Sequence, residues 1–277
     1  MYGKGRSGLF RGKTYIQLKM KRCVIKIGGV LLEDGEQLER LCRKLTAIKT
    51  PFVLVHGGGV FAGQLAKQLG IPCRMVDGRR VTDDNMLRVT VMAYAGWVNK
   101  ILVARLQSFG VNACGLSGCD MDMVRAERRV QEGLEWGHVG DVARVNTGML
   151  EALLDQDIVP VLSPITCDGQ GGLLNSNADG IAAAVAKALA RLGEVELIYC
   201  FDKRGVLADV NDDKTVIPGL TPVMYKALRR EKLIHEGMIP KLDYAFSTIQ
   251  AGVKSVRLLH PDELDNPVAG TRITGEE

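Results

Sequence analysis

CVIKIGG (residues 23–29) is a short apolar run followed by a glycine-rich turn, and FVLVHGGG (residues 52–59) repeats that pattern one crossover later. Each apolar run is typical of a buried parallel strand, and the stretch between them is typical of a crossover helix. Glycine lets the backbone approach a ligand closely and expose its N–H groups, and the free amides of the next helix add positive potential. Two such turns at neighbouring strand ends predict one cleft for two anionic groups, as in phosphoryl transfer from a nucleotide to an acidic small molecule.

Neither glycine-rich turn is specific when it is taken alone. Turns of this kind are common in α/β proteins, where many serve only the close packing of a helix against the sheet. Neither has the pattern G-x-G-x-x-G of dinucleotide-binding domains or the pattern G-x-x-x-x-G-K-[ST] of P-loops. A dehydrogenase-type nucleotide domain is therefore disfavoured, and the interpretation depends on the residues described below.

The composition is ordinary for a globular protein of one large domain or two close lobes, with 277 residues of which 46% are hydrophobic and 25% charged. No apolar run approaches the roughly 18 residues of a membrane helix, and the few aromatic residues give no sign of base-stacking platforms. The seven cysteines are scattered and include no C-x-x-C pair. This pattern favours reduced thiols in the cytoplasm over a disulfide framework or a zinc site.

The net charge of +4 comes from the N-terminal segment, because residues 1–22 contain seven lysines and arginines and no acid. Without these seven, 29 basic residues face 32 acidic ones. A nucleic-acid-binding surface on the body of the protein is therefore not expected. The segment also carries four glycines and lacks the apolar core of a signal peptide. We expect residues 1–22 to be a disordered leader, either of transit type or upstream of a true start at Met20, which we favour.

Strand and helix patterns alternate along the rest of the chain. The predicted strands are 23–27, 52–55, 111–116, 158–162, 195–201 and 254–259, and the predicted helices are 34–48, 60–69, 84–108, 147–155, 178–191, 221–232 and 241–251. Between them we expect a hairpin over 74–81, an irregular section over 120–145 and a functional loop over 165–177. The βα alternation predicts an α/β fold, a three-layer α/β/α sandwich with a mostly parallel open central sheet. Ligands of such sheets lie at the carboxyl ends of the strands.

Six segments of the chain together resemble the amino acid kinase family, and within it the enzymes that phosphorylate N-acetylglutamate. They are KIGGVLL (26–32), VHGGG (55–59), DGRRVT (77–82), LLNSNAD (173–179), GMIPK (237–241) and GTRI (270–273). They follow the order of the family and span nearly everything after residue 22. The resemblance implies ATP and Mg²⁺ as cofactors and transfer of the γ-phosphoryl group to the side-chain carboxylate of an N-acyl-glutamate. This would give an acyl phosphate, in the second step of arginine biosynthesis.

The resemblance also implies a division of labour within one continuous sheet. We expect an N-terminal lobe, residues 23–170, to bind the acyl-amino acid and to form a dimer contact. A C-terminal lobe, residues 171–277, would bind ATP. The helix predicted over 84–108 carries more apolar surface than one sheet face requires, which indicates a homodimer. Because arginine-sensitive relatives form hexamers through an added N-terminal helix and the glycine-rich leader is a poor helix former, we favour an insensitive dimer.

Lys26, Lys241 and Asp179 are the candidate catalytic residues. Lys241 begins a predicted helix, where a cation is unfavourable unless an anionic partner is present. The resemblance assigns both lysines to stabilising the transferred phosphoryl group and Asp179 to holding the lysines in place, although Asp179 is equally compatible with a helix N-cap. A carboxylate acceptor, with a pKa of about 4.3 for glutamate, is ionised at neutral pH and needs no general base.

The resemblance implies that the acceptor is held by Gly58, Gly59, Arg80 and Asn175. The guanidinium of Arg80 would bind the α-carboxylate in bidentate fashion, and Asn175 would bind the acylated amide. The amides of Gly58 and Gly59 would hold the acceptor end. The amides of Gly28 and Gly29 would hold the phosphate end.

The nucleotide side is less clear from the residues themselves. The resemblance places ATP at Asp202, Gly205, Val206, Leu207, Leu233, Ile234 and His235. The intervening pair Lys203-Arg204 departs from the family's pattern, which leaves side-chain contacts there open. Magnesium would be held mainly by phosphate oxygens and water, so we name no metal ligand.

Several alternatives remain at this point. A cation near the acyl group would favour N-succinyl-glutamate, and Arg79, Arg125, Arg128 and Arg129 are candidates. An N-acyl-aminoadipate kinase is a further possibility. A non-catalytic relative that binds arginine or a nucleotide is disfavoured, because a sensor has no need of Lys26, Asp179 and Lys241.

Overall fold

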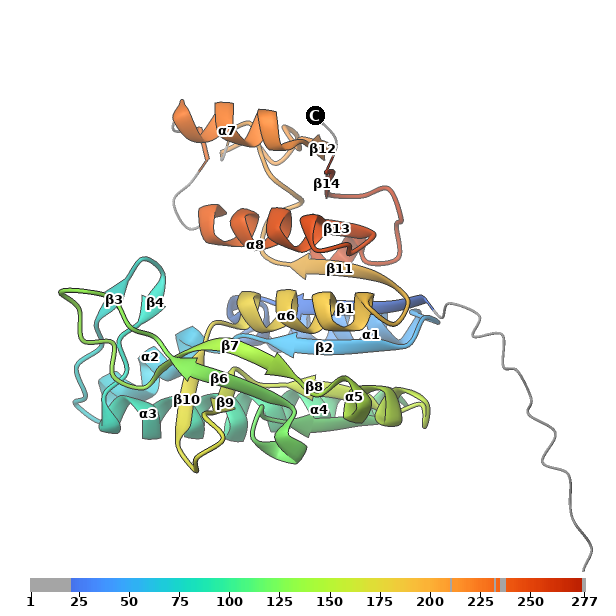
Figure 1. The fold of residues 1–277 in the computed structure, drawn as a ribbon. Helices are drawn as coiled ribbons and strands as arrows, with labels where there is room; N and C mark the ends of the chain where they lie inside the picture. Colours follow the sequence, from blue (N-terminus) through green and yellow to red (C-terminus); the bar gives the residue numbers. More distant parts are fainter. Residues whose placement is uncertain (1–20, 210, 232, 235–237, 276–277) are drawn as a thin grey trace, which may run out of the picture.

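The computed structural model describes residues 21–209, 211–231, 233–234 and 238–275. Its central sheet has eight strands in the order β12-β14-β13-β11-β1-β2-β8-β5 (Figure 1). Their bounds, in that order, are Gly219–Leu220, Thr271–Ile273, Ser255–Leu259, Glu194–Cys200, Lys21–Ile27, Phe52–His56, Val159–Leu162 and Ala113–Leu116. Neighbouring strands are parallel except β13 and β14, so the predicted mostly parallel open sheet is confirmed.

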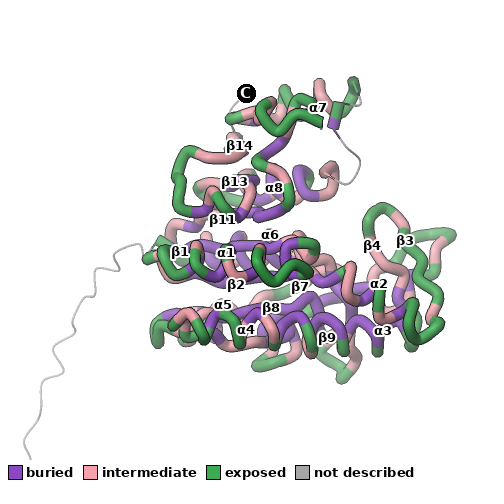
Figure 2. The backbone as a smooth tube through the Cα atoms, turned by 180° about the vertical axis from the view of Figure 1, so that it is seen from behind, coloured by how far each residue is buried: buried purple, intermediate pink, exposed green. Residues whose placement is uncertain are grey.

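Helices cover both faces of this sheet, which explains why its strands are apolar on both sides. One face packs against α5 (Thr147–Leu154), α6 (Ala178–Ala190) and α8 (Ile239–Gln250), and the other packs against α1 (Gly35–Thr46) and α4 (Asn99–Ser108). Figure 1 shows α6 and α8 in front of the sheet, and Figure 2, from behind, shows α1 and α4 over purple buried strands. Strand alternation turns Val24 toward α6 and Ile25 toward α1.

A second, smaller sheet closes on itself beside α6. It consists of β6 (Val124–Arg128), β7 (Val139–Val145), β9 (Ile165–Cys167) and β10 (Leu173–Ser176), in the order β10-β7-β6-β9. The irregular section expected over 120–145 and the loop expected over 165–177 are therefore wrong in part. Within 165–177, residues 168–172 form the turn between β9 and β10, in which the Asp168 carboxylate accepts hydrogen bonds from the N–H groups of Gln170 and Gly172. Within 120–145, residues 129–138 connect β6 to β7 and lie outside both strands. The strands are three to seven residues long, too short for their alternation to stand out.

The predicted helix over 84–108 is one helical run in three parts. It begins with α3 (Asp84–Thr90), capped by the Asp83 carboxylate, continues as a π-helix over Val91–Val98, and ends as α4. The π-helical section carries Met92 and Trp97, whose exposed fractions are 50% and 61%. Periodicity at 3.6 residues per turn predicts the run but not its wider middle.

Other elements agree with the sequence within a few residues, with two exceptions. The short strands β12 and β14 were not predicted, because two and three residues carry no alternation. Lys21 and Arg22, assigned to the leader, belong to β1, and the buried Arg22 forms an ion pair with Glu151 at 2.7 Å. The remaining α-helices and strands of the described residues are α2 (Gly59–Gln68), α7 (Pro222–Arg230) and the hairpin β3–β4 (Met75–Val76 and Arg79–Arg80). No helix among the described residues is both long and apolar enough to cross a bilayer.

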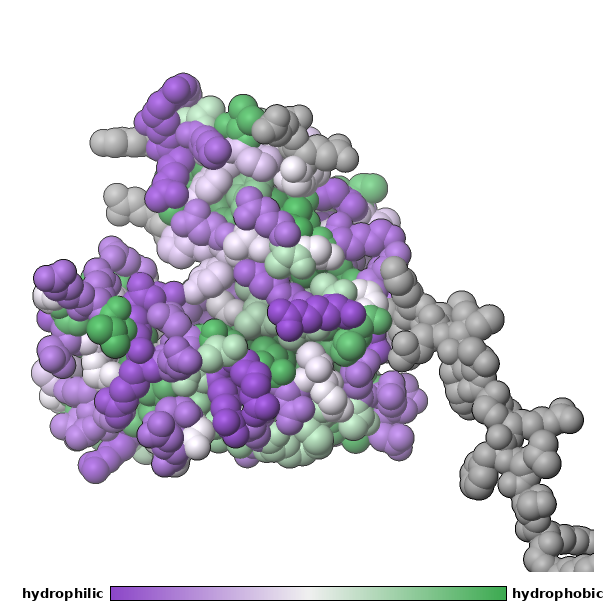
Figure 3. Space-filling view, viewed as in Figure 1, coloured by the Kyte–Doolittle hydropathy of each residue, from purple (hydrophilic) through white to green (hydrophobic). Residues whose placement is uncertain are grey.

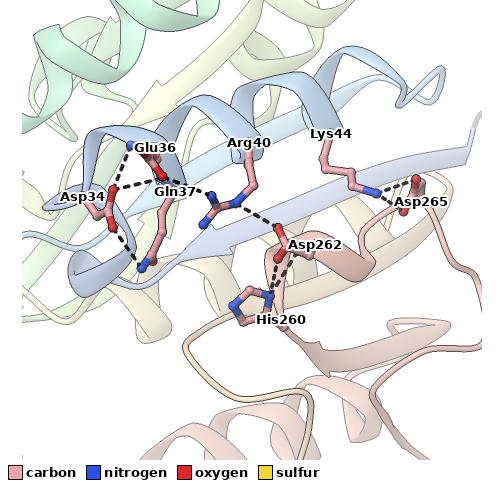
Figure 4. A network of polar contacts seen from close by, with 8 residues as sticks. All are labelled: Asp34, Glu36, Gln37, Arg40, Lys44, His260, Asp262 and Asp265. Atoms are coloured by element: carbon pink, nitrogen blue, oxygen red, sulfur yellow. Dashed lines mark hydrogen bonds and ion pairs between the residues drawn. The ribbon is translucent and has the colours of Figure 1, made fainter.

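Exposed ion pairs join α1 to the segment that follows β13, as Figure 4 shows. Lys44 contacts Asp265 at 2.7 Å, and Arg40 lies 3.8 Å from Asp262. We call this group, Arg40, Lys44, Asp262 and Asp265, the α1 surface cluster. It connects α1 to the last fifth of the chain.

Candidate active site

Lys26 lies near the carboxyl end of β1, where the chain order of the strands reverses. From β1 the sheet continues through β2 on one side and through β11 on the other. Such a switch point is where open α/β sheets leave a crevice for ligands. The alternation that turns Val24 toward α6 turns Lys26 the same way, so its ammonium group meets the first turn of that helix.

The two glycine-rich turns touch each other beside this lysine. A Cβ atom at Gly29 would lie 2.9 Å from the amide nitrogen of Gly58, and one at Gly58 would lie 2.6 Å from the ring of Tyr94. Only glycine therefore allows this approach. Gly58 and Gly59 begin α2, whose first N–H groups precede the helical hydrogen bonds and can face a ligand.

One expected amide is not available. The N–H of Gly28 donates to the carbonyl of Cys200 at 3.0 Å, so it extends the sheet rather than facing the cleft. A strand-to-turn boundary cannot be placed to one residue from sequence, and this one lies between Gly28 and Gly29. Gly29 therefore stays a candidate for amide contact, whereas Gly28 can contribute only its lack of a side chain.

Behind the second turn lies His56, a buried histidine that supports the glycines. Its Nδ1 donates to the carbonyl of Gly57 at 2.7 Å and its Nε2 accepts from the amide of Asn99 at 3.0 Å. Burial lowers the pKa of His56 to about 4, so the ring is neutral near pH 7. This matches a structural role for His56.

Lys26, Asp179 and Lys241 form a compact trio. The Asp179 carboxylate lies 2.7 Å from the Lys26 ammonium and 3.0 Å from that of Lys241. Burial alone would raise the pKa of Asp179, but the two ammonium groups hold it below its usual range. Burial, together with the charge of Lys241, lowers the pKa of Lys26. Two cations and one anion leave an excess positive charge in a site largely removed from water, which attracts an anion.

The helix start assigns different tasks to neighbouring residues. Asn177, not Asp179, is the N-cap of α6, because its side-chain oxygen accepts from the N–H of Gly180 at 3.0 Å. The Asp179 carboxylate is thus left to the lysines. Tyr199 lies beneath: its hydroxyl donates to the Asp179 carbonyl at 3.2 Å, and the Lys241 ammonium lies 5.3 Å from its ring centre.

A cavity with a volume of about 160 Å³ has Ala178, the residue before Asp179, in its lining. All four residues expected to hold the acceptor line it: Gly58, Gly59, Arg80 and Asn175. Tyr94, Ser176 and Asn177 also line it and were missed. Sequence could have indicated the last two, since they lie within the LLNSNAD segment.

Arg80 is held in the wall of this cavity by one end of its guanidinium. Its Nη2 donates to the Gly59 carbonyl at 2.8 Å, and its Nη1 contacts the Cys73 sulfur. Its buried Nε has no hydrogen-bond partner among the described residues. Asn175 donates to the Thr82 hydroxyl at 3.0 Å, which leaves its side-chain oxygen for a ligand.

Sequence and structure comparisons agree on the relatives of this chain. The model of the amino acid kinase family matches residues 21–260. The chain belongs to the amino acid kinase family. A protein of Phocaeicola vulgatus named acetylglutamate kinase is 51% identical over 239 residues, covering 86% of this chain and 93% of that protein. The protein of the same name from Parabacteroides distasonis is 48% identical over 253 residues, covering 91% and 99%.

Solved structures show the same amino acid kinase fold. The crystal structure of smu.665 from Streptococcus mutans UA159 has a TM-score of 0.76 at 30% identity, covering 92% of this chain and 99% of that one. Carbamate kinase from Giardia lamblia bound to AMP-PNP has a TM-score of 0.69 at 15% identity, covering 93% and 99%, and supports the fold alone.

The expected nucleotide residues of this amino acid kinase lie in the loop after β11 and in the segment after α7, and their side chains do not all face outward. Val206 and Ile234 are buried in the main core, with exposed fractions of 3% and 8%, so their side chains pack inward. Asp202 and Leu233 are exposed. His235 lies outside the described residues.

Gly205 is fixed by packing in the same loop. A Cβ atom at Gly205 would lie 2.8 Å from the Thr271 hydroxyl, which accepts from the N–H of Val206 at 2.8 Å. Leu207 pairs with Val216 across an isolated bridge. The unusual Lys203-Arg204 pair forms ion pairs with Asp213 and Glu263. Local acids therefore account for these two cations without a nucleotide.

Proposed function

We propose that the protein is an acetylglutamate kinase, which transfers the γ-phosphoryl group of ATP to the side-chain carboxylate of N-acetyl-L-glutamate. The trio of Lys26, Asp179 and Lys241 beside a cavity lined by Arg80 and Asn175 carries this proposal. The names of the relatives at 46–51% identity support the same substrate. The product would be an acyl phosphate in arginine biosynthesis.

In the proposed reaction the chain aligns two anions and neutralises charge. Arg80 binds the α-carboxylate of the acceptor, Asn175 binds its acylated amide, and the amides of Gly58 and Gly59 hold its reacting end. A side-chain carboxylate oxygen then forms a bond to the γ-phosphorus while the bond from that phosphorus to the β,γ-bridging oxygen breaks and ADP leaves. The acceptor is already ionised, so no proton moves to a base.

Lys26 and Lys241 stabilise the charge on the phosphoryl oxygens in the transition state. Asp179 keeps the two ammonium groups close enough to act on the same oxygens, because without it they would repel each other. Gly29 supplies an amide on the phosphate side. The trio therefore favours the transition state, in which charge is spread over the moving group.

The nucleotide is proposed to lie over the C-terminal lobe, residues 171–277, at Asp202, Gly205, Leu207, Leu233 and His235, with backbone contacts from Val206 and Ile234. Magnesium accompanies ATP in this proposal. No group of three or more metal-binding side chains is placed to hold an ion within the described ranges, and both Asp179 oxygens face lysines. We propose that phosphate oxygens and water hold most of the Mg²⁺ coordination, and we assign no protein ligand.

We further propose a cytoplasmic homodimer whose contact lies on the N-terminal lobe, residues 23–170. Met92 and Trp97 expose half or more of their surface on the π-helical section. Light scattering coupled to size exclusion tests this, with Trp97→Asp expected to be a monomer. A wild-type chain that runs as a monomer would contradict it.

A coupled assay of ADP release tests the activity with N-acetyl-L-glutamate, N-succinyl-L-glutamate and free glutamate as acceptors. We expect turnover with N-acetyl-L-glutamate and little with free glutamate, which lacks the acylated amide. Faster turnover with the succinyl compound or with an N-acyl-aminoadipate would change the substrate. Absence of ADP release with every acceptor would leave the regulatory relative as the better interpretation.

A further inference from the structure

Arg79 is used differently from its neighbour Arg80. Its side chain is 16% exposed, and its guanidinium reaches from the β3–β4 hairpin to α8, where Nη2 donates to the Tyr244 hydroxyl at 2.6 Å. Its Nη1 lies 3.3 Å from the Asp141 carboxylate on β7. Figure 3 shows the molecule indented between the hairpin end and the part that carries α8. Arg79 is therefore a contact between two regions that are distant in sequence.

Each end of this contact also touches a different part of the active site. The hairpin end is part of the acceptor cavity, which Met75, Gly78, Arg79 and Arg80 line. At the other end, Tyr244 follows Lys241 by three residues on α8, so the two side chains lie on the same side of that helix. The Tyr244 hydroxyl also packs over Gly180, where a Cβ atom would lie 2.9 Å away. Gly180 directly follows Asp179.

We propose that the Arg79–Tyr244 hydrogen bond couples acceptor binding to the placement of Lys241. An acceptor held by Arg80 fixes β4, and β4 carries Arg79. Arg79 then holds Tyr244, which keeps the first turns of α8 against the start of α6 and so keeps Lys241 on Asp179. Arg79 and Tyr244 are positioning residues, because they contact each other and Gly180, the neighbour of Asp179, and would act on the reacting atoms only through Asp179 and Lys241.

This inference rests on the proposed function, since it concerns its acceptor and nucleotide. In this proposal a bound acceptor places Lys241 for the phosphates of the nucleotide and so raises nucleotide affinity. Because coupling between two sites is reciprocal, bound nucleotide must raise acceptor affinity by the same factor. Substituting a residue with only a structural role would change stability, or would change the acceptor affinity equally with and without nucleotide. The ratio of the two acceptor dissociation constants is therefore the measurement that isolates the effect.

The experiment is calorimetric titration of N-acetyl-L-glutamate into the full-length chain, with and without Mg²⁺ and AMP-PNP. For the wild type we expect at least about 5-fold tighter acceptor binding with nucleotide, the lower end of ordinary coupling. Tyr244→Phe keeps the ring and removes the hydroxyl, and should bring the ratio to within about 2-fold of unity. Arg79→Lys removes the forked guanidinium and should do the same. The double variant should match either single variant.

Tyr225→Phe is the matched control, because its hydroxyl donates to Asp243 at 2.6 Å and, among the described residues, forms hydrogen bonds with α8 alone. Its ratio should equal that of the wild type. An unchanged ratio in both Tyr244→Phe and Arg79→Lys, in wild-type protein that binds both ligands, would overturn the coupling and leave the proposed function intact. Wild-type protein that binds neither ligand would overturn the proposed function and this inference with it.

Discussion

Two groups of ion pairs join distant parts of this chain, and they differ in what surrounds them. In the trio, the three side chains are 9%, 16% and 11% exposed and their charges do not cancel. In the α1 surface cluster, Lys44 and Asp265 are 31% and 50% exposed and pair with each other, while Arg40 lies 3.8 Å from both Glu36 and Asp262 (Figure 4). Water screens the second group and not the first.

This difference in burial and net charge distinguishes a candidate active site from ordinary surface ion pairs. Burying unbalanced charge is unfavourable for folding, so its presence at a strand end indicates a function that needs it. Exposed ion pairs of balanced charge change the free energy of folding little, and they are common on the surfaces of globular proteins. Both groups consist of the same residue types, and only burial and net charge distinguish them.

Lys26→Met is expected to have the largest effect of the substitutions that test this comparison. The remaining Lys241–Asp179 pair would be balanced, so stability should change little, whereas kcat should fall about 10³-fold because a charge on the moving phosphoryl group is lost. ADP release and urea denaturation of the same preparation measure the two effects. A stable variant with near wild-type kcat would show that the trio is only structural.

Asp179→Asn should follow with about a 10²-fold loss of kcat per folded molecule. Two buried ammonium groups would then repel each other, and we expect about 3 kcal/mol less stability. Circular dichroism in the assay buffer gives the folded fraction. Equal activity per folded molecule would exclude the positioning role of Asp179.

Arg80→Lys tests the acceptor side of the same site. Lysine keeps the charge but not the bidentate geometry, so we expect KM for the acceptor to rise about 10- to 100-fold with a smaller change in KM for ATP. The control is Arg144→Lys on the exposed end of β7, which should alter neither value. An equal rise in both KM values would contradict acceptor binding by Arg80.

His56 allows a test by pH alone. Its pKa is depressed to about 4 in the folded chain from a usual 6.5, so the unfolded chain binds more protons between these values. Stability should therefore fall as pH drops below 6.5, by about 2 kcal/mol at pH 5, and level off below pH 4. Urea denaturation at pH 7 and pH 5 measures this. His56→Gln should remove most of the difference; an unchanged pH dependence would assign it to another group.

The smallest effect is expected in the α1 surface cluster. Lys44→Ala should lower the free energy of unfolding by less than about 1 kcal/mol and leave kcat unchanged. The double variant with Asp265→Ala measures the pair itself. A coupling as large as that within the trio would mean that exposure does not distinguish the two groups.

Much of the fold could be predicted from the sequence, because the spacing of apolar residues in a long segment shows which of its faces are buried. Val24 and Ile25 point to opposite faces, and both faces are apolar, which predicts a covered parallel sheet. The strands of the closed sheet, such as β7 and β10, are held by packing around Gly140 and not by local pattern, so β7 was read as part of an irregular section and β10 as part of a loop. The bridge from Arg79 to Tyr244 could not be seen either, because nothing in a sequence states which hydroxyl a guanidinium will reach.

The candidate site also has a part that the sequence predicts and a part that it does not. Lys26, Asp179, Lys241, Arg80 and Asn175 occur in short segments that the family keeps in order, so their positions could be assigned before any coordinates. Gly28 shows the limit, since its amide was expected in the cleft and instead donates to Cys200 within the sheet. Backbone direction at a strand end changes over one residue, and no residue pattern fixes it that finely.

The contact of Gly29 with the backbone of Gly58 has a consequence for anyone who wishes to change what this protein accepts. At that seam even one methyl group would force the two turns apart, so mutagenesis has no room to vary it. Other parts of the cavity lining are side chains, among them Met75 and Val139. A library aimed at new acceptors should diversify these side chains and keep the seam fixed.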